Sequence, residues 1–74
     1  MLISQKELLR RIAKNIRRVR KMRGYTQEDV IDGLDSFHLI SYQRFESKNP
    51  PNMRVYNLYQ IAEFLKVSID ELMK

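Results

Sequence analysis

The sequence predicts an all-α fold, a compact domain of five helices that occupies residues 1–74. Apolar residues recur at intervals of three and four along most of the chain, which is the spacing of one helix face. No segment alternates apolar and polar residues with a period of two, so no strand is predicted. With 74 residues, the chain has room for one domain with a small core.

The first helix is expected to run from Gln5 to about Arg23. Ser4 can cap it, and Glu7 lies three residues later, as a capping box requires. Gly24 supplies a stop signal at the C-terminal end. The stripe expected to face the core consists of Leu9, Ile12, Ile16 and Val19.

The second helix is expected from Gln27 to Gly33 or Leu34, with Thr26 as its N-cap. Residues 35–37 then form a short connection, in which Asp35 or Ser36 can cap the next helix. Because the second helix is so short, packing against the rest of the domain must hold it. Its inward-facing residues are expected to be Val30, Ile31 and Leu34.

The third helix is expected to reach about Glu46. We take Tyr42 and Phe45, three residues apart, as its buried pair. This choice leaves the opposite side of the helix to Leu39, Gln43 and Arg44.

The segment Ser47–Asn52 contains paired prolines and is predicted to be a loop, with Asn52 as the cap of a fourth helix over residues 53–66. Ser68 and Glu71 form a second possible capping box, which opens a short final helix over residues 69–73. The inward stripe of the fourth helix is expected to be Val55, Leu58, Ile61, Ala62 and Leu65.

The net charge of +5 is distributed unevenly. Residues 1–24 carry nine Lys or Arg and one acid, whereas residues 25–74 carry five basic and eight acidic groups. An asymmetry of this size favours an anionic partner, because a basic surface attracts polyanions over several ångströms.

Several function classes are disfavoured by composition. The chain has no cysteine and one histidine, so no metal site or disulfide is expected. It lacks a glycine-rich phosphate loop and a nucleophile–base pair, so no enzyme, cofactor or small-molecule ligand is expected. No apolar run is long enough for a membrane span, and no signal peptide is recognisable, so a cytoplasmic protein is the expectation.

The polar side of the third helix suits the edges of DNA bases. Glutamine pairs with adenine and arginine with guanine in the major groove, which makes Gln43 and Arg44 the first candidates. His38 can reach a base or a phosphate, and Leu39 or Ile40 can contact a thymine methyl. Phosphate contacts are expected from the loop and the start of the fourth helix, at Lys48, Asn52 and Arg54.

The order of these features resembles the phage-repressor type of helix-turn-helix domain, the Cro/repressor or XRE-like family. The resemblance covers residues 9–73, and its helix-turn-helix unit would span about residues 26–46. The chain departs from the pattern by one extra residue between Val30 and Glu46, which leaves the register of the third helix open by one position, and by the lack of the usual turn glycine. The positions that carry the resemblance are Ile12, Ile16, Val19 and Arg20, the turn Gly24–Gln27, the pair Phe45–Glu46 and the segment 61–72.

The resemblance implies a role for three further residues. Arg20 and Glu46 would form a partly buried ion pair that ties the first helix to the third, so Arg20 would not contact DNA. Gln27 stands where the family commonly uses a glutamine to contact a phosphate, at the N-terminus of the second helix.

The function implied is a sequence-specific regulator of transcription that binds double-stranded DNA, as a small phage or plasmid repressor or a restriction–modification controller. Such readers usually bind palindromic operators as homodimers. The dimer seam is expected in the C-terminal part, from Phe64, Ile69, Leu72 and Met73. Two alternatives remain open: an antitoxin of a toxin–antitoxin pair, and a protein-interaction module that uses the basic first helix.

Overall fold

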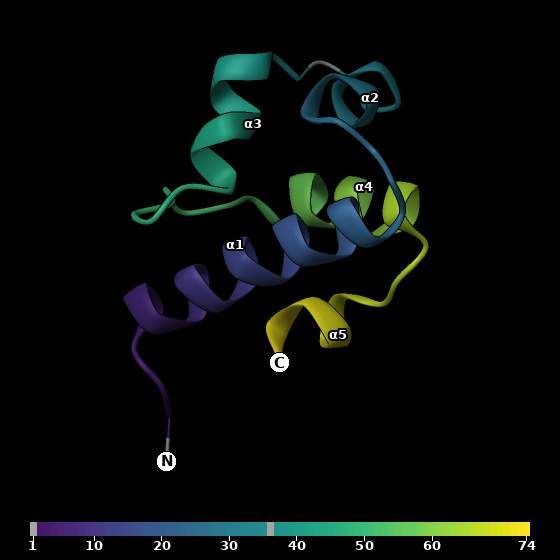
Figure 1. Cartoon of the computed structure of the whole chain (residues 1–74). Helices are drawn as coiled ribbons and strands as arrows, with labels where there is room; N and C mark the ends of the chain where they lie inside the picture. The colour runs from purple at the N-terminus through teal and green to yellow at the C-terminus, as the bar shows by residue number, and fades with distance from the viewer. Residues whose placement is uncertain (1, 36) are drawn as a thin grey trace.

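The computed structural model describes residues 2–35 and 37–74. In the described part the chain forms five helices and no strand, as the sequence predicts (Figure 1). The helices are α1 (Gln5–Met22), α2 (Gln27–Asp32), α3 (Leu39–Phe45), α4 (Val55–Leu65) and α5 (Ile69–Met73). No helix in the described part of the chain is long and apolar enough to span a bilayer.

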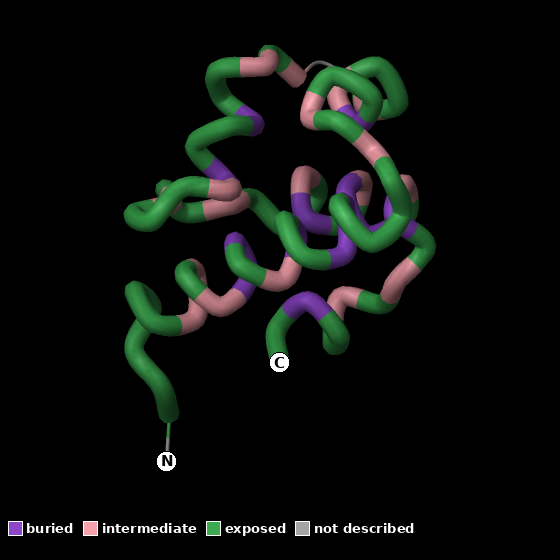
Figure 2. The backbone as a smooth tube through the Cα atoms, viewed as in Figure 1, coloured by how far each residue is buried: buried purple, intermediate pink, exposed green. Residues whose placement is uncertain are grey.

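The long helix α1 is the centre of the arrangement. In Figure 1, α2 and α3 lie above α1, α5 lies below it and α4 runs behind it. The buried residues of Figure 2 gather where these helices face one another. The side chains that are fully buried in this core are Ile16, Val30, Tyr42, Ile61, Leu65 and Leu72. Leu72 is therefore part of the core, and its predicted place in a dimer seam is wrong.

Three of the helices begin at hydroxyl caps, as expected. In each, the cap oxygen accepts a hydrogen bond from the backbone N–H three residues on, and the caps are Ser4, Thr26 and Ser68. At α2 the box is complete, because the Asp29 carboxylate also accepts from the Thr26 N–H at 2.8 Å. Among the hydrogen bonds of the described residues, neither the Glu7 nor the Glu71 carboxylate accepts such a bond from the N–H of its cap residue. The two predicted capping boxes are thus single caps.

The connection between α2 and α3 is longer than the predicted turn at residues 35–37. Helix α2 ends at Asp32, and a Cβ on the next residue, Gly33, would collide with the ring of Phe64. Helix α3 begins only at Leu39, because Phe37 packs edge-on against Phe45 with ring centroids 5.6 Å apart. The stretch 33–38 therefore contains two positions that lie against aromatic rings, Gly33 beside Phe64 and Phe37 against Phe45.

The cap predicted for α3 is also wrong. His38 occupies the N-cap position and makes no side-chain cap hydrogen bond, so Asp35 does not serve there. The other predicted cap, Ser36, lies outside the described residues.

Helix α4 begins two residues later than predicted, and Asn52 does not cap it. Arg54 is the N-cap, without a side-chain hydrogen bond. Met53 packs against the core from the preceding segment, and Val55 is 79% exposed instead of facing inward. The rest of the predicted stripe is buried as expected: Leu58, Ile61, Ala62 and Leu65.

Two helices end at residues with a left-handed backbone. Gly24 has φ +77° and follows the cap of α1, as its stop signal predicts. Lys66 ends α4 with φ 59°, and the N–H of Val67 then donates to the Ala62 carbonyl at 3.0 Å. This Schellman arrangement usually uses glycine, because a Cβ is unfavourable in that conformation.

Candidate nucleic-acid interface

Helix α3 turns one face to the core and the other to solvent. Tyr42 and Phe45 are buried, as predicted, and Gln43 and Arg44 are exposed. Of the two apolar candidates near its start, Ile40 is 67% exposed and Leu39 is half-buried. The outward face of α3 therefore carries Ile40, Gln43 and Arg44.

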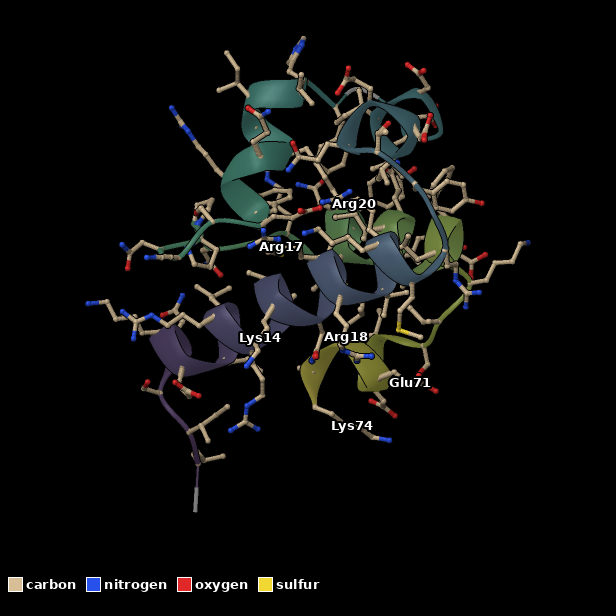
Figure 3. All side chains as sticks on the ribbon, in the orientation of Figure 1. Lys14, Arg17, Arg18, Arg20, Glu71 and Lys74 are labelled. Atoms are coloured by element: carbon tan, nitrogen blue, oxygen red, sulfur yellow. The ribbon has the colours of Figure 1, made fainter. Side chains whose placement is uncertain are left out.

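An ion pair braces the C-terminal end of α3 to α1. Arg20 Nε donates to Glu46 Oε2 at 2.8 Å, and Arg20 Nη2 donates to Glu46 Oε1 at 3.0 Å. The remaining Arg20 nitrogen, Nη1, donates to the Tyr25 carbonyl at 2.8 Å. The side chains of Arg20 and Glu46 are only 10% and 3% exposed. Three segments of the fold therefore meet at one guanidinium, and Arg20 has a structural position. Figure 3 shows Arg20 on the side of α1 that faces α2 and α3.

The pair is charged at neutral pH. Burial on its own would raise the pKa of Glu46, but the hydrogen bonds and charge of Arg20, together with the neighbouring Tyr42 and Gln27, outweigh it and lower this pKa below the usual value. The hydrogen bond to Glu46 raises the pKa of Arg20 despite its burial. Burial raises the pKa of the neighbouring Tyr42 far above its usual value, so its hydroxyl stays neutral. This hydroxyl is buried and has no hydrogen-bond partner among the described residues.

The brace continues to the surface of α3 through Gln27. The Gln27 amide nitrogen donates to Glu46 Oε1 at 3.3 Å, and its carbonyl oxygen accepts from Gln43 Nε2 at 3.2 Å. A chain of side-chain hydrogen bonds thus leads from the buried Arg20 to the exposed Gln43. Because Gln43 is held from one side, its orientation is set before any partner arrives.

Five predicted site residues fall in three groups around α3. His38 and Arg44 line a cavity of about 270 Å³ between the start of α3 and α4, whose wall includes Asn57. Lys48 lines a second cavity, of about 520 Å³, between α1 and the loop after α3. Asn52 and Arg54 are exposed in the segment before α4 and line neither cavity.

Sequence reasoning missed the second cavity. Three of its basic residues come from one face of α1, at the spacing of four and then three residues: Arg10, Lys14 and Arg17. This spacing is visible in the sequence. The opposite wall, residues 46–49, could not be placed against it without knowledge of how the loop packs.

The described residues include no group of His, Cys, Asp and Glu side chains that is arranged to hold a metal ion. No protein-family model, curated protein or solved structure matches the chain.

Proposed function

We propose that the protein is a sequence-specific regulator that binds double-stranded DNA, with α2 and α3 as its helix-turn-helix unit and α3 in the major groove. The observation that carries the proposal is the outward face of α3, where Gln43 and Arg44 are exposed while the helix is braced from behind by Arg20 and Glu46. A groove-reading helix must present such side chains on a rigid support, because base recognition depends on their geometry.

Each exposed residue has a chemical counterpart on the duplex. Gln43 matches adenine, Arg44 matches guanine, and Ile40, the more exposed of the two apolar candidates, can contact a thymine methyl. His38 lies in the cavity beside Arg44 and can contribute a base or phosphate contact from there.

Phosphate contacts would come from residues around this helix. Lys48 follows α3, and Asn52 and Arg54 precede α4. Gln27, to which the resemblance assigns a phosphate, also supports Gln43. Contacts of this kind position a protein on the duplex but carry no sequence information.

We further propose a homodimer on a palindromic operator, because one module of this size offers too little interface for tight specific binding. A repressor or controller of this kind acts in the cytoplasm, where it meets its DNA. The exposed Met73 remains available for the dimer seam.

Selection of binding sites from random duplexes tests the proposal. Enrichment of palindromic half-sites about one helical turn apart would support both DNA reading and dimerisation. Arg44→Ala should reduce discrimination between the selected site and random duplex by ~1–3 kcal/mol. Lys48→Ala should weaken both by the same factor. Absence of any enriched sequence, or a preference unchanged in Arg44→Ala and Gln43→Ala, would refute the proposal and favour a module that binds through the basic face of α1.

A further inference from the structure

The second cavity brings four basic side chains together from two segments of the chain. One wall is the face of α1 that carries Arg10, Lys14 and Arg17, and the other is the loop of residues 46–49, which includes Lys48. Arg10 Nη2 donates to Asn49 Oδ1 at 3.4 Å, which links the two walls at the N-terminal side of α1. We call this space, of about 520 Å³, the basic cavity.

The positive charge of the basic cavity has no counter-charge of its own. Among the described residues that line it, Glu46 is the only acidic one, and both of its oxygens already accept hydrogen bonds from Arg20. Within the described part of the chain, the ion pairs are those of Arg20 with Glu46 and of Arg11 with Glu7. None of the four cations of the cavity takes part in either. Like charges gathered around one space repel one another, and a bound anion relieves that repulsion.

The donors in the cavity suit a phosphate group. Arginine and lysine supply charge-assisted N–H donors from two walls, and phosphate offers several acceptor oxygens to them at once. Ser47, in the loop wall, uses its hydroxyl to donate to the Arg44 carbonyl, and that bond holds the loop against the end of α3. The cavity therefore begins where the reading helix ends.

We propose that the basic cavity is a phosphate-binding site, and that it takes a phosphate of the duplex that α3 reads, beside the half-site. The second part rests on the proposed function, whereas the phosphate chemistry does not. Lys48 lines the cavity and also follows α3 closely in the chain. The sugar–phosphate backbone of a DNA strand that passes α3 can therefore continue to the basic face of α1. The cavity would then extend the protein's contact with the duplex beyond the bases.

The test compares two double variants of equal charge. Lys14→Ala/Arg17→Ala removes two cations of the cavity. Arg11→Ala/Arg18→Ala removes two from the same helix outside it. Figure 3 shows Arg17 on the side of α1 that faces α3 and Arg18 on the side that faces α5. Alanine is the best helix former, so both variants should keep α1.

The first arm uses inorganic phosphate. At about ten times the Kd, phosphate should raise the thermal midpoint of the wild type by roughly 6–11 °C over chloride at equal ionic strength. The cavity variant should lose this excess and the control variant should keep it. General salting-out by phosphate acts alike on all three proteins and so cancels in the comparison.

The second arm uses a duplex of random sequence and measures affinity against salt. Each lost phosphate contact should reduce the slope of log affinity on log salt by about 0.9. Between about 50 and about 200 mM salt, the affinity of a cavity variant that loses two contacts should therefore fall by a factor about tenfold smaller than that of the wild type. The control variant should keep the wild-type slope.

The outcomes separate the claims. A loss confined to the cavity variant in both arms supports the proposal. An effect in the phosphate arm alone would overturn the duplex as the source and assign the site to a free phosphate ester. Equal behaviour of the two variants in both arms would overturn the site itself. Neither arm needs a selected DNA sequence. A site selection that yields no consensus would therefore refute the proposed function, while these two arms would still test phosphate binding at the basic cavity.

Discussion

Removal of one partner from the ion pair between Arg20 and Glu46 should cost the domain a large share of its stability. Glu46→Ala takes away both carboxylate acceptors of the Arg20 guanidinium. Arg20 is only 8% exposed, and the Tyr25 carbonyl would be its remaining acceptor. Stranding a buried charge in this way costs ~3–5 kcal/mol. A domain of 74 residues has a free energy of unfolding of roughly 4–11 kcal/mol in total. The thermal midpoint should fall by roughly 12–40 °C, at about 4–8 °C for each kcal/mol.

Urea unfolding followed by circular dichroism measures this cost, and a double-mutant cycle isolates the pair. Arg20→Met/Glu46→Ala should be less destabilised than the sum of its single variants, because it leaves no buried charge without a partner. If Glu46→Ala does not fold at all, Arg20→Lys gives the milder test: it keeps the charge but loses the bidentate geometry. A cost below about 1 kcal/mol for Glu46→Ala is typical of exposed pairs and would refute the buried brace.

Three further predictions concern acid stability and backbone conformation. The pKa of Glu46 is lowered in the folded state, so its contribution to stability is present above the pKa of a glutamate in the unfolded chain and is lost as pH falls through the folded value. The difference in unfolding free energy between wild type and Glu46→Gln should therefore close on acidification. A constant difference in urea titrations from about pH 7 to about pH 3 would contradict this. Gly33→Ala should lower the free energy of unfolding by ~1–3 kcal/mol, because the Cβ of the alanine meets the Phe64 ring. In a Phe64→Ala background this cost should be smaller. A Gly33→Ala variant more stable than the wild type would show that the ring moves aside freely. Lys66→Gly should raise the free energy of unfolding by about 1 kcal/mol and Gly24→Ala should lower it by a similar amount, because both positions have a left-handed backbone that disfavours a Cβ. A Cβ at position 24 meets no atom within 4 Å, so the cost there comes from the backbone alone. A change of the same sign in both variants would contradict this.

The sequence was most informative where helix signals are local. The starts of α1, α2 and α5 are set by a hydroxyl cap and the N–H three residues on, and both lie in the same short segment. The core stripes of α1 and α4 follow from their spacing, apart from Val55 and the half-buried Leu9. The pair of Arg20 and Glu46, 26 residues apart, came from the family resemblance, and the structure contains it.

The errors lie where tertiary contacts compete with local signals. Asn52 is a good cap by composition, but Met53 packs on the core and delays α4. Asp35 is likewise a good cap, but the contact of Phe37 with Phe45 delays α3 until Leu39. Neither contact is visible in the spacing of residues along one segment. The same holds for the basic cavity, because its loop wall lies far along the chain from α1.

The sequence alone leaves the orientation of α3 open, because the family resemblance places one extra residue between Val30 and Glu46. In the structure, the orientation is set from the C-terminal end of α3: Tyr42 and Phe45 are buried, and Glu46 is held by Arg20. Because a rotation of α3 by one residue would pull Glu46 from its buried partner, the brace opposes it by several kcal/mol, on the order of the cost of breaking a buried pair. The exposure of Gln43 and Arg44 thus depends on the ion pair and the core more than on the turn.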